Sequence, residues 1–182
     1  EGGNEEAVSI CKDKRIALVS ATGSTQMGKE LAPMVSARLG KLLLELGGNN
    51  AAIVCPSADL DLTIKGIAFS ACGTTGQRCT SLRRLFVHED IYDDCVKRLQ
   101  DCFDDLIIGC PSKEGSQIGP LISEESYNRM QEIIDSLKSK GVEVIGGERT
   151  NIEDPKEFYV KPALVLVNNI EEEMLKETFA PI

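Results

Sequence analysis

The sequence has no tryptophan and only one histidine, His88, among its 182 residues. A Ser-His-Asp hydrolase or a multi-histidine metal site would have to be built around that single imidazole, so both classes are disfavoured. Basic residues are also scarce, since 20 Lys and Arg stand against 29 Asp and Glu, giving a formal net charge of -9. This balance argues against nucleic acid or an anionic membrane surface as the partner.

No apolar run approaches the roughly 18 residues that a membrane-spanning helix needs, and no signal peptide is recognisable. The seven cysteines are an odd number without a Cys-x-x-Cys pair, which disfavours a disulfide framework and a zinc ribbon. We therefore expect a reducing compartment, the cytoplasm, with the mitochondrion as the alternative in a eukaryote. Because the chain begins without an initiator methionine, we also expect it to be a piece of a longer protein.

The sequence does contain enough apolar residues, 42%, to build one sizeable core. Strand-like apolar runs alternate with helical patterns along the chain, which predicts an α/β fold with a parallel-rich sheet and flanking helices. The expected strands are 15–20, 42–46, 50–55, 84–88, 142–145 and 159–167. Helices are expected after the glycine-rich turn at 23–28 and over 59–72, 91–106 and 123–141.

The glycine-rich turn follows the first predicted strand and opens a helix. Gly23, Gly28 and Lys29 fit the spacing of the phosphate loop of nucleoside triphosphatases, but Glu30 stands where that loop needs a magnesium-binding hydroxyl. Backbone N–H groups at the helix start, with Ser24 nearby, can instead hold the pyrophosphate of a dinucleotide. The plain alternative is a tight turn in which glycine allows a positive φ.

Two residues are chemically conspicuous. Cys79 lies in a polar loop between a predicted helix and strand, and the neighbouring Arg78 favours the thiolate, which is the nucleophilic form. Glu45 is a carboxylate inside an apolar strand, a setting that suits a general base near neutral pH. The alternatives are a buried, inert thiol and an outward-pointing strand residue.

Five short stretches together resemble the aldehyde dehydrogenase superfamily, in the family's order and spacing across essentially the whole chain. They are Thr22-Gly23-Ser24-Thr25 with Gly28, Leu44-Glu45-Leu46-Gly47-Gly48, Gly76-Gln77-Arg78-Cys79, Gly119-Pro120-Leu121 and Glu177-Thr178-Phe179-Ala180-Pro181. Asn49-Asn50, the run from Gly73 to Cys79 and the ending at Ile182 look most like the antiquitin branch. Two positions depart from the common pattern: Ala180 stands where most relatives have glycine, and Ala21 replaces an aromatic residue.

The resemblance implies that Cys79 attacks an aldehyde and that Glu45 activates the water that hydrolyses the resulting thioester. It also implies NAD as the cofactor, with NADP as the alternative, and no metal. The implied cofactor contacts are Ser24 at the pyrophosphate, Leu46 and Gly47 on the nicotinamide side, and Glu177 at the ribose with Phe179 packing nearby. In the antiquitin branch the substrate is an amino-acid semialdehyde of lysine breakdown, and Arg78 is a candidate for pairing with its distal carboxylate.

By the same resemblance, residues 1–45 form the C-terminal part of a nucleotide-binding domain and residues 46–182 most of the thiol-bearing catalytic domain. The family's adenine site and its asparagine oxyanion donor belong to a segment upstream, so we expect this chain alone to have lost turnover. The expected partner is a small-molecule aldehyde, with neither nucleic acid nor membrane, and the full-length protein is expected to be a homo-oligomer. The competing hypothesis is a non-catalytic fold module or partner-binding domain of the same superfamily.

Overall fold

The chain divides into two units, Glu1–Gly47 and Gly48–Ile182. The structure is a computed structural model that describes residues 3–150 and 157–182. No helix within these described ranges is both long enough and apolar enough to cross a membrane.

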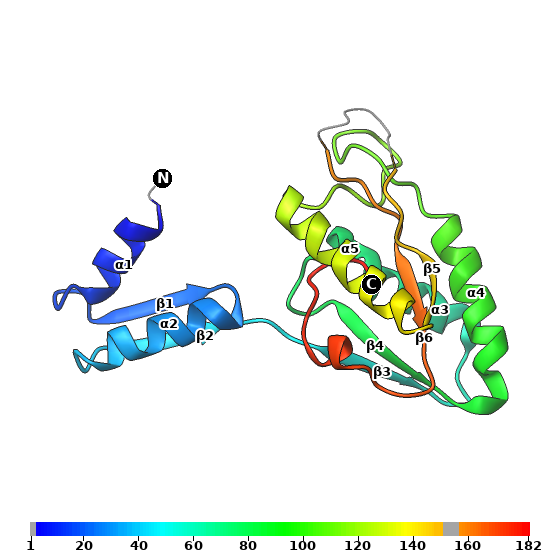
Figure 1. The fold of residues 1–182 in the computed structure, drawn as a ribbon, viewed down its shortest axis with the longest axis horizontal. Helices are drawn as coiled ribbons and strands as arrows, with labels where there is room; N and C mark the ends of the chain where they lie inside the picture. Colours follow the sequence, from blue (N-terminus) through cyan, green and yellow to red (C-terminus); the bar gives the residue numbers. More distant parts are fainter. Residues whose placement is uncertain (1–2, 151–156) are drawn as a thin grey trace. The chain divides into compact units, whose positions relative to one another are not determined.

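The first unit is a strand–helix–strand crossover preceded by a short helix. Its elements are α1 (Asn4–Lys12), β1 (Leu18–Thr22), α2 (Thr25–Ser36) and β2 (Lys41–Glu45). β1 and β2 pair in parallel, from Leu18 opposite Lys41 to Thr22 opposite Glu45, and α2 runs alongside them (Figure 1). The core of this unit consists of Cys11, Val19, Leu31 and Val35. Because the pairing is parallel, the carboxyl ends of both strands lie at the same edge.

The second unit begins with another parallel crossover. Its elements are β3 (Asn50–Val54), α3 (Leu60–Cys72), the 3-10 turn Gly73–Gly76, β4 (Leu82–Val87), the 3-10 turn Glu89–Ile91 and α4 (Tyr92–Asp104). Asp59 caps α3, because its side chain accepts a hydrogen bond from the N–H of Leu62 at 3.2 Å. Helices α3 and α4 lie beside the β3–β4 pair (Figure 1), and the shared core contains Val54, Ile64, Ile67, Leu82, Cys95 and Leu99.

The remainder of the second unit packs a long helix against an antiparallel pair. Its elements are α5 (Glu124–Ser139), β5 (Glu143–Gly146), β6 (Ala163–Leu166) and the 3-10 turn Glu172–Leu175. Ser123 caps α5 through the N–H of Ser126. The core here is formed by Leu121, Met130, Ile134, Val160, Ala163 and Ala180. Ala180 brings the end of the chain into this core.

The predicted α/β class is confirmed, with differences in detail. The described strands form three separate pairs, two parallel and one antiparallel. The predicted strand 159–167 shortens to β6, since Pro162 has no N–H for the ladder. The first strand lies later than predicted, at Leu18–Thr22, and helix α1 was not predicted because it starts after Gly3 rather than after a Ser, Thr or Asp cap.

Candidate active site

The loop before Cys79 has an unusual backbone. Thr74 and Thr75 have φ values of 55° and 56°, and Gly76 follows at 65°. Residues other than glycine seldom adopt this left-handed backbone conformation, and those that do often lie at functional sites. The buried Thr75 hydroxyl donates to the carbonyl of Gly119 at 2.8 Å and holds the strained turn in place.

Gly76 is required by both conformation and space. Besides its positive φ, a Cβ at this position would collide with the backbone carbonyl of Ala180. We expect Gly76→Ala to lower the free energy of unfolding by roughly 2–4 kcal/mol, from backbone strain plus overpacking. Gly66 lies in α3, where an added methyl group would meet nothing within 4 Å, so Gly66→Ala should raise stability by about 0.5–1 kcal/mol. Urea unfolding of both variants checks this pair, and similar losses in both would contradict the assigned role of Gly76.

Cys79 is exposed, but its backbone is tightly held. The side-chain amide of Asn50, at the start of β3, donates to the carbonyl of Cys79 at 2.7 Å and to that of Ser81 at 2.9 Å. The buried Ser81 closes the loop on itself, since its hydroxyl accepts from the N–H of Arg78 and its own N–H donates to the carbonyl of Arg78. The thiol is therefore presented on a loop whose peptide groups have fixed directions.

The other cysteines differ from Cys79 in exposure. Cys11, Cys72 and Cys95 are buried, Cys102 and Cys110 are half-buried, and Cys55 is exposed after the end of β3. Burial raises the pKa of the Cys72 thiol to about 12 and also raises the pKa of Cys95. These two thiols stay protonated and unreactive at neutral pH.

The Gly48 backbone approaches both the Cys79 loop and the carboxylate of Glu177. A Cβ on Gly48 would collide with the carbonyl oxygen of Cys79, so only glycine allows this approach. The N–H of Gly48 donates to Oε2 of Glu177 at 3.2 Å. Glu177, predicted as a ribose contact, is thus a half-buried carboxylate with a fixed partner rather than a freely solvated surface charge.

Arg83 and Phe179 complete this part of the site. Arg83 pairs with Oε1 of Glu177 at 3.4 Å, and its guanidinium lies 5.8 Å from the ring centre of Phe179. Burial lowers the pKa of Arg83 while Glu177 raises it, and an arginine stays charged in this situation. Phe179 has a φ of 56°, so it is a further strained residue in addition to Thr74 and Thr75.

Arg78 lies next to Cys79 on the exposed side of the loop. Its guanidinium is 5.8 Å from the ring centre of Phe69, a residue of α3 that is 69% exposed. An exposed aromatic ring under a guanidinium limits the directions in which the charged fork can point. The role predicted for Arg78, pairing with a distal substrate carboxylate, stays a prediction.

In the first unit, the predicted cofactor turn and Glu45 lie at one edge of the parallel pair. The Oγ of Ser24 accepts from the N–H of Met27 at 3.1 Å and caps α2. Ser24 therefore lies at the helix start, where backbone N–H groups have no partner within the helix. The N–H of Gly23 donates to the carbonyl of Glu45 at 3.0 Å. Glu45 is the exposed last residue of β2, and the carboxyl end of a parallel sheet is where ligands of α/β proteins bind.

Leu46 and Gly47 follow Glu45 in the same unit. The Leu46 side chain packs over Gly28 of α2, which is why a larger residue does not fit at Gly28. Leu46 thereby attaches the end of β2 to the turn that carries Ser24. The roles predicted for Ser24, Glu45, Leu46 and Gly47 stay predictions.

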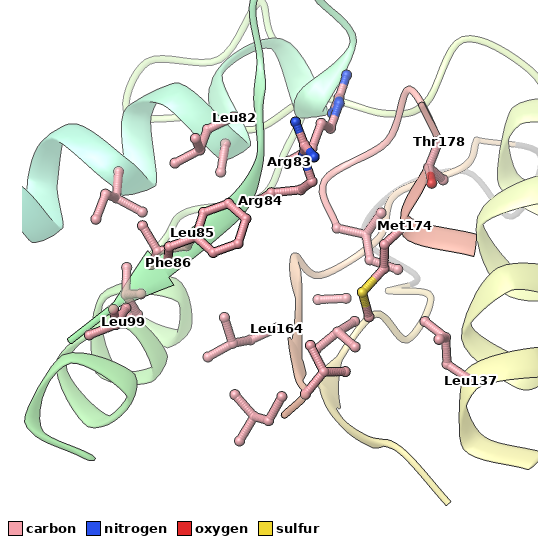
Figure 2. A pocket seen from close by; sticks show the side chains of 18 of the residues that line it. Leu82, Arg83, Arg84, Leu85, Phe86, Leu99, Leu137, Leu164, Met174 and Thr178 are labelled. Atoms are coloured by element: carbon pink, nitrogen blue, oxygen red, sulfur yellow. The ribbon is translucent and has the colours of Figure 1, made fainter. Parts of the chain in front are cut away.

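The cavity of about 200 Å³ in the second unit lies elsewhere, along β4 and β6 (Figure 2). Its walls are mainly aliphatic, with Leu82, Phe86, Leu99, Leu137, Leu164 and Met174 pointing into or along it. Arg83, Arg84 and Thr178 supply polar atoms at its margin. Neither Cys79 nor Glu177 lines this cavity, so we do not assign it to an aldehyde or to a cofactor.

Two contacts were not predicted from the sequence: Asn50 holds the Cys79 loop, and Arg83 pairs with Glu177. A polar amide at the first position of a strand was the only local signal for Asn50. Arg83 offered none, because two of its three acceptors, Ala180 and Glu177, belong to a distant segment of the chain.

The whole chain is similar in sequence to known aldehyde dehydrogenases. The model of the "Aldehyde dehydrogenase family" matches residues 1–182. The chain is 42% identical to "Alpha-aminoadipic semialdehyde dehydrogenase" of Rattus norvegicus, covering 100% of this chain and 33% of the relative, and 41% identical to "Aldehyde dehydrogenase family 7 member A1" of Brassica napus, covering 100% and 36%. The chain thus spans about a third of the length of the curated relatives it matches.

Solved structures show the same likeness. A betaine aldehyde dehydrogenase of Staphylococcus aureus in complex with NAD+ superposes with a TM-score of 0.92 at 26% identity, covering 99% of this chain and 36% of that one. Succinate-semialdehyde dehydrogenase of Burkholderia pseudomallei gives a TM-score of 0.90 at 30% identity, covering 100% and 38%.

Proposed function

The chain belongs to the aldehyde dehydrogenase family, and we propose from this premise that it is the thiol-bearing part of an enzyme that oxidises an aldehyde to a carboxylic acid with NAD. The observation that carries the proposal is the exposed Cys79 on a loop whose backbone is fixed beside Gly48 and Glu177. Residues 1–45 then belong to a nucleotide-binding domain and residues 46–182 to the catalytic domain.

In the first step, the Cys79 thiolate attacks the aldehyde carbon and forms a tetrahedral thiohemiacetal. The negative oxygen is held by the Cys79 N–H, with a further donor supplied from outside these 182 residues. Asn50 supports this step because it fixes the carbonyl of Cys79 and thereby the orientation of the loop. A preorganised donor of this kind needs no rearrangement when the charge develops.

In the second half of the reaction, Glu45 takes a proton from water as that water attacks the thioester. The carbon–sulfur bond breaks, the carboxylic acid leaves, and the Cys79 thiol is regenerated. Only Leu46 and Gly47 separate Glu45 from Gly48 in the sequence, and Gly48 contacts the carbonyl of Cys79. This short separation supports Glu45 as the base.

We propose that Ser24, Leu46, Gly47, Glu177 and Phe179 hold the cofactor. The chemistry of these groups fits a dinucleotide. The Ser24 hydroxyl accepts one hydrogen bond and keeps its own hydrogen to donate to a phosphate oxygen, while each Glu177 oxygen has one protein partner and a second lone pair for a ribose hydroxyl. NAD, when bound, supplies an acceptor for the hydride that leaves the substrate carbon; NADP is the alternative.

The substrate we propose is an amino-acid semialdehyde, in line with the name of the relative "Alpha-aminoadipic semialdehyde dehydrogenase". The resemblance to the antiquitin branch supports lysine breakdown as the source of this semialdehyde. Arg78 would pair with its distal carboxylate in a bidentate manner. The longer protein would act as a homo-oligomer in the cytoplasm or the mitochondrion. The 182 residues alone would not complete turnover, since they span about a third of the relatives' length.

An ester that needs no cofactor tests the thiol chemistry on this chain. The Cys79 thiolate should attack p-nitrophenyl acetate, release p-nitrophenolate in a burst stoichiometric with the chain, and retain the acetyl group as a thioester. Peptide mapping then locates the acetyl group. Acetylation spread over the accessible cysteines would favour the non-catalytic module, and rapid NADH formation from a semialdehyde by these 182 residues would overturn the loss of turnover.

A further inference from the structure

Arg83 occupies an irregular position in β4. The parallel register places Asn50 opposite Leu82 and Ala51 opposite Arg84, so Arg83 is the extra residue of a β-bulge. A bulge interrupts the alternation of side chains along a strand and redirects one of them. The redirected side chain is only 5% exposed, although it carries a full positive charge.

The guanidinium of Arg83 joins three parts of the second unit. Nη1 donates to the carbonyl of Ala180 at 2.8 Å, and Nη2 donates to the carbonyl of Arg78 at 3.1 Å and contacts Oε1 of Glu177 at 3.4 Å. The first and third acceptors belong to the chain end, and the second is the peptide group directly before Cys79. One rigid fork thus spans the segment that carries Glu177 and the loop that carries the thiol.

Glu177 extends this connection to a third segment. Its other oxygen, Oε2, accepts the N–H of Gly48, and Gly48 lies against the carbonyl of Cys79. The contacts therefore form a closed circuit from Arg83 to Glu177, Gly48, the Cys79 loop and back. Removing the guanidinium would leave a half-buried carboxylate with a single weak partner, so its direction would no longer be fixed.

We propose that Arg83 is a positioning residue that fixes the Glu177 carboxylate and the peptide group before Cys79 in one frame, so that the ribose-binding group and the nucleophile keep a constant separation. The inference rests on the proposed function for the roles of Glu177 and Cys79. The circuit of contacts itself does not depend on those roles.

The test uses the full 182-residue chain and the variants Arg83→Met, Arg83→Lys and Glu177→Gln. Hydrogen exchange of the Gly48 amide, followed by NMR, reports on the Glu177 contact. The second measurement is the rate of Cys79 acetylation by p-nitrophenyl acetate divided by the rate of its alkylation by iodoacetamide. Because both rates depend on the exposure of the thiol, their ratio reports on the orientation of the loop. Arg149→Met is the matched control, because the Arg149 guanidinium also lies over an aromatic ring, 5.4 Å from the ring centre of Tyr127, as that of Arg83 does over Phe179.

Arg83→Met should accelerate Gly48 exchange about tenfold and lower the acetylation ratio about tenfold. Lysine keeps the positive charge but lacks the planar set of donors of a guanidinium. Arg83→Lys should therefore give a Gly48 exchange rate between those of the unmodified chain and Arg83→Met. In the Glu177→Gln background, Arg83→Met should add little to the exchange rate, whereas independent structural effects would multiply. Arg149→Met should change neither quantity.

Unchanged Gly48 exchange in both Arg83 variants, or multiplying effects in the double variant, would overturn the proposal. If Arg83→Met does not fold, Arg83→Lys and Glu177→Gln still decide it through the Gly48 amide. Absence of acetylation in the unmodified chain would count against the proposed function alone, because the exchange measurement needs no chemistry at Cys79.

Discussion

Replacing Cys79 by serine is expected to lower acetylation of the chain by p-nitrophenyl acetate about a thousandfold or more. Loss of a catalytic nucleophile typically has effects of this size or larger, and a serine hydroxyl here has no histidine beside it to activate it. The remaining thiols cannot substitute, because burial keeps Cys72 and Cys95 protonated and none of the others lies on the loop that contacts Gly48.

The matched control is Cys55→Ser, since Cys55 is the other exposed thiol. Its loss should leave the burst of p-nitrophenolate intact. A burst that survives Cys79→Ser but disappears in Cys55→Ser would remove Cys79 from the mechanism and with it the enzymatic interpretation of this loop.

Replacing Glu45 by glutamine should leave the burst unchanged but slow the later hydrolysis of the thioester by about a hundredfold to ten-thousandfold. Glutamine has a similar shape but cannot take the proton from the attacking water. The acetylated chain should therefore accumulate, and intact-mass measurement during the reaction would follow it directly.

Lys41→Gln provides the control for Glu45, because Lys41 is exposed at the other end of the same strand. Its thioester should decay at the unmodified rate. Equal decay in Glu45→Gln and the unmodified chain would show that another group, or water alone, hydrolyses the thioester.

Much of the fold was predictable from local pattern. The starts of α3 and α5 were predictable because a cap and its helix are neighbours in the sequence. Of the candidate caps in the sequence, Asp59 or Ser57 and Ser123 or Ser126, the structure uses Asp59 and Ser123. Which strands pair was harder to predict from the sequence, because strand pairing depends on contacts between distant segments. The antiparallel β5–β6 pair within an otherwise parallel pattern is the clearest example.

In the site, too, features with a local sequence signal could be predicted and features that depend on distant segments could not. Cys79 stands out in the sequence because a thiol in a polar loop has chemical meaning without knowledge of its neighbours. Asn50 acts through acceptors in a distant segment, and so does Arg83 at Ala180 and Glu177. Arg83 also needs a bulge that the residue pattern does not indicate. Candidates for the chemistry can be proposed from the sequence alone, whereas the residues that hold the Cys79 loop became visible only with the fold.

We propose that Glu45 and Cys79 act on the same aldehyde, and a short cross-linker tests this proposal directly. In the Glu45→Cys variant, bismaleimidoethane should link position 45 to Cys79, as peptide mapping would reveal. In Lys41→Cys, whose side chain is on the same face of β2 about 13 Å away along the strand, the reagent should attach without reaching Cys79. Efficient linkage from position 41, or none from position 45 while both thiols react singly, would contradict the account.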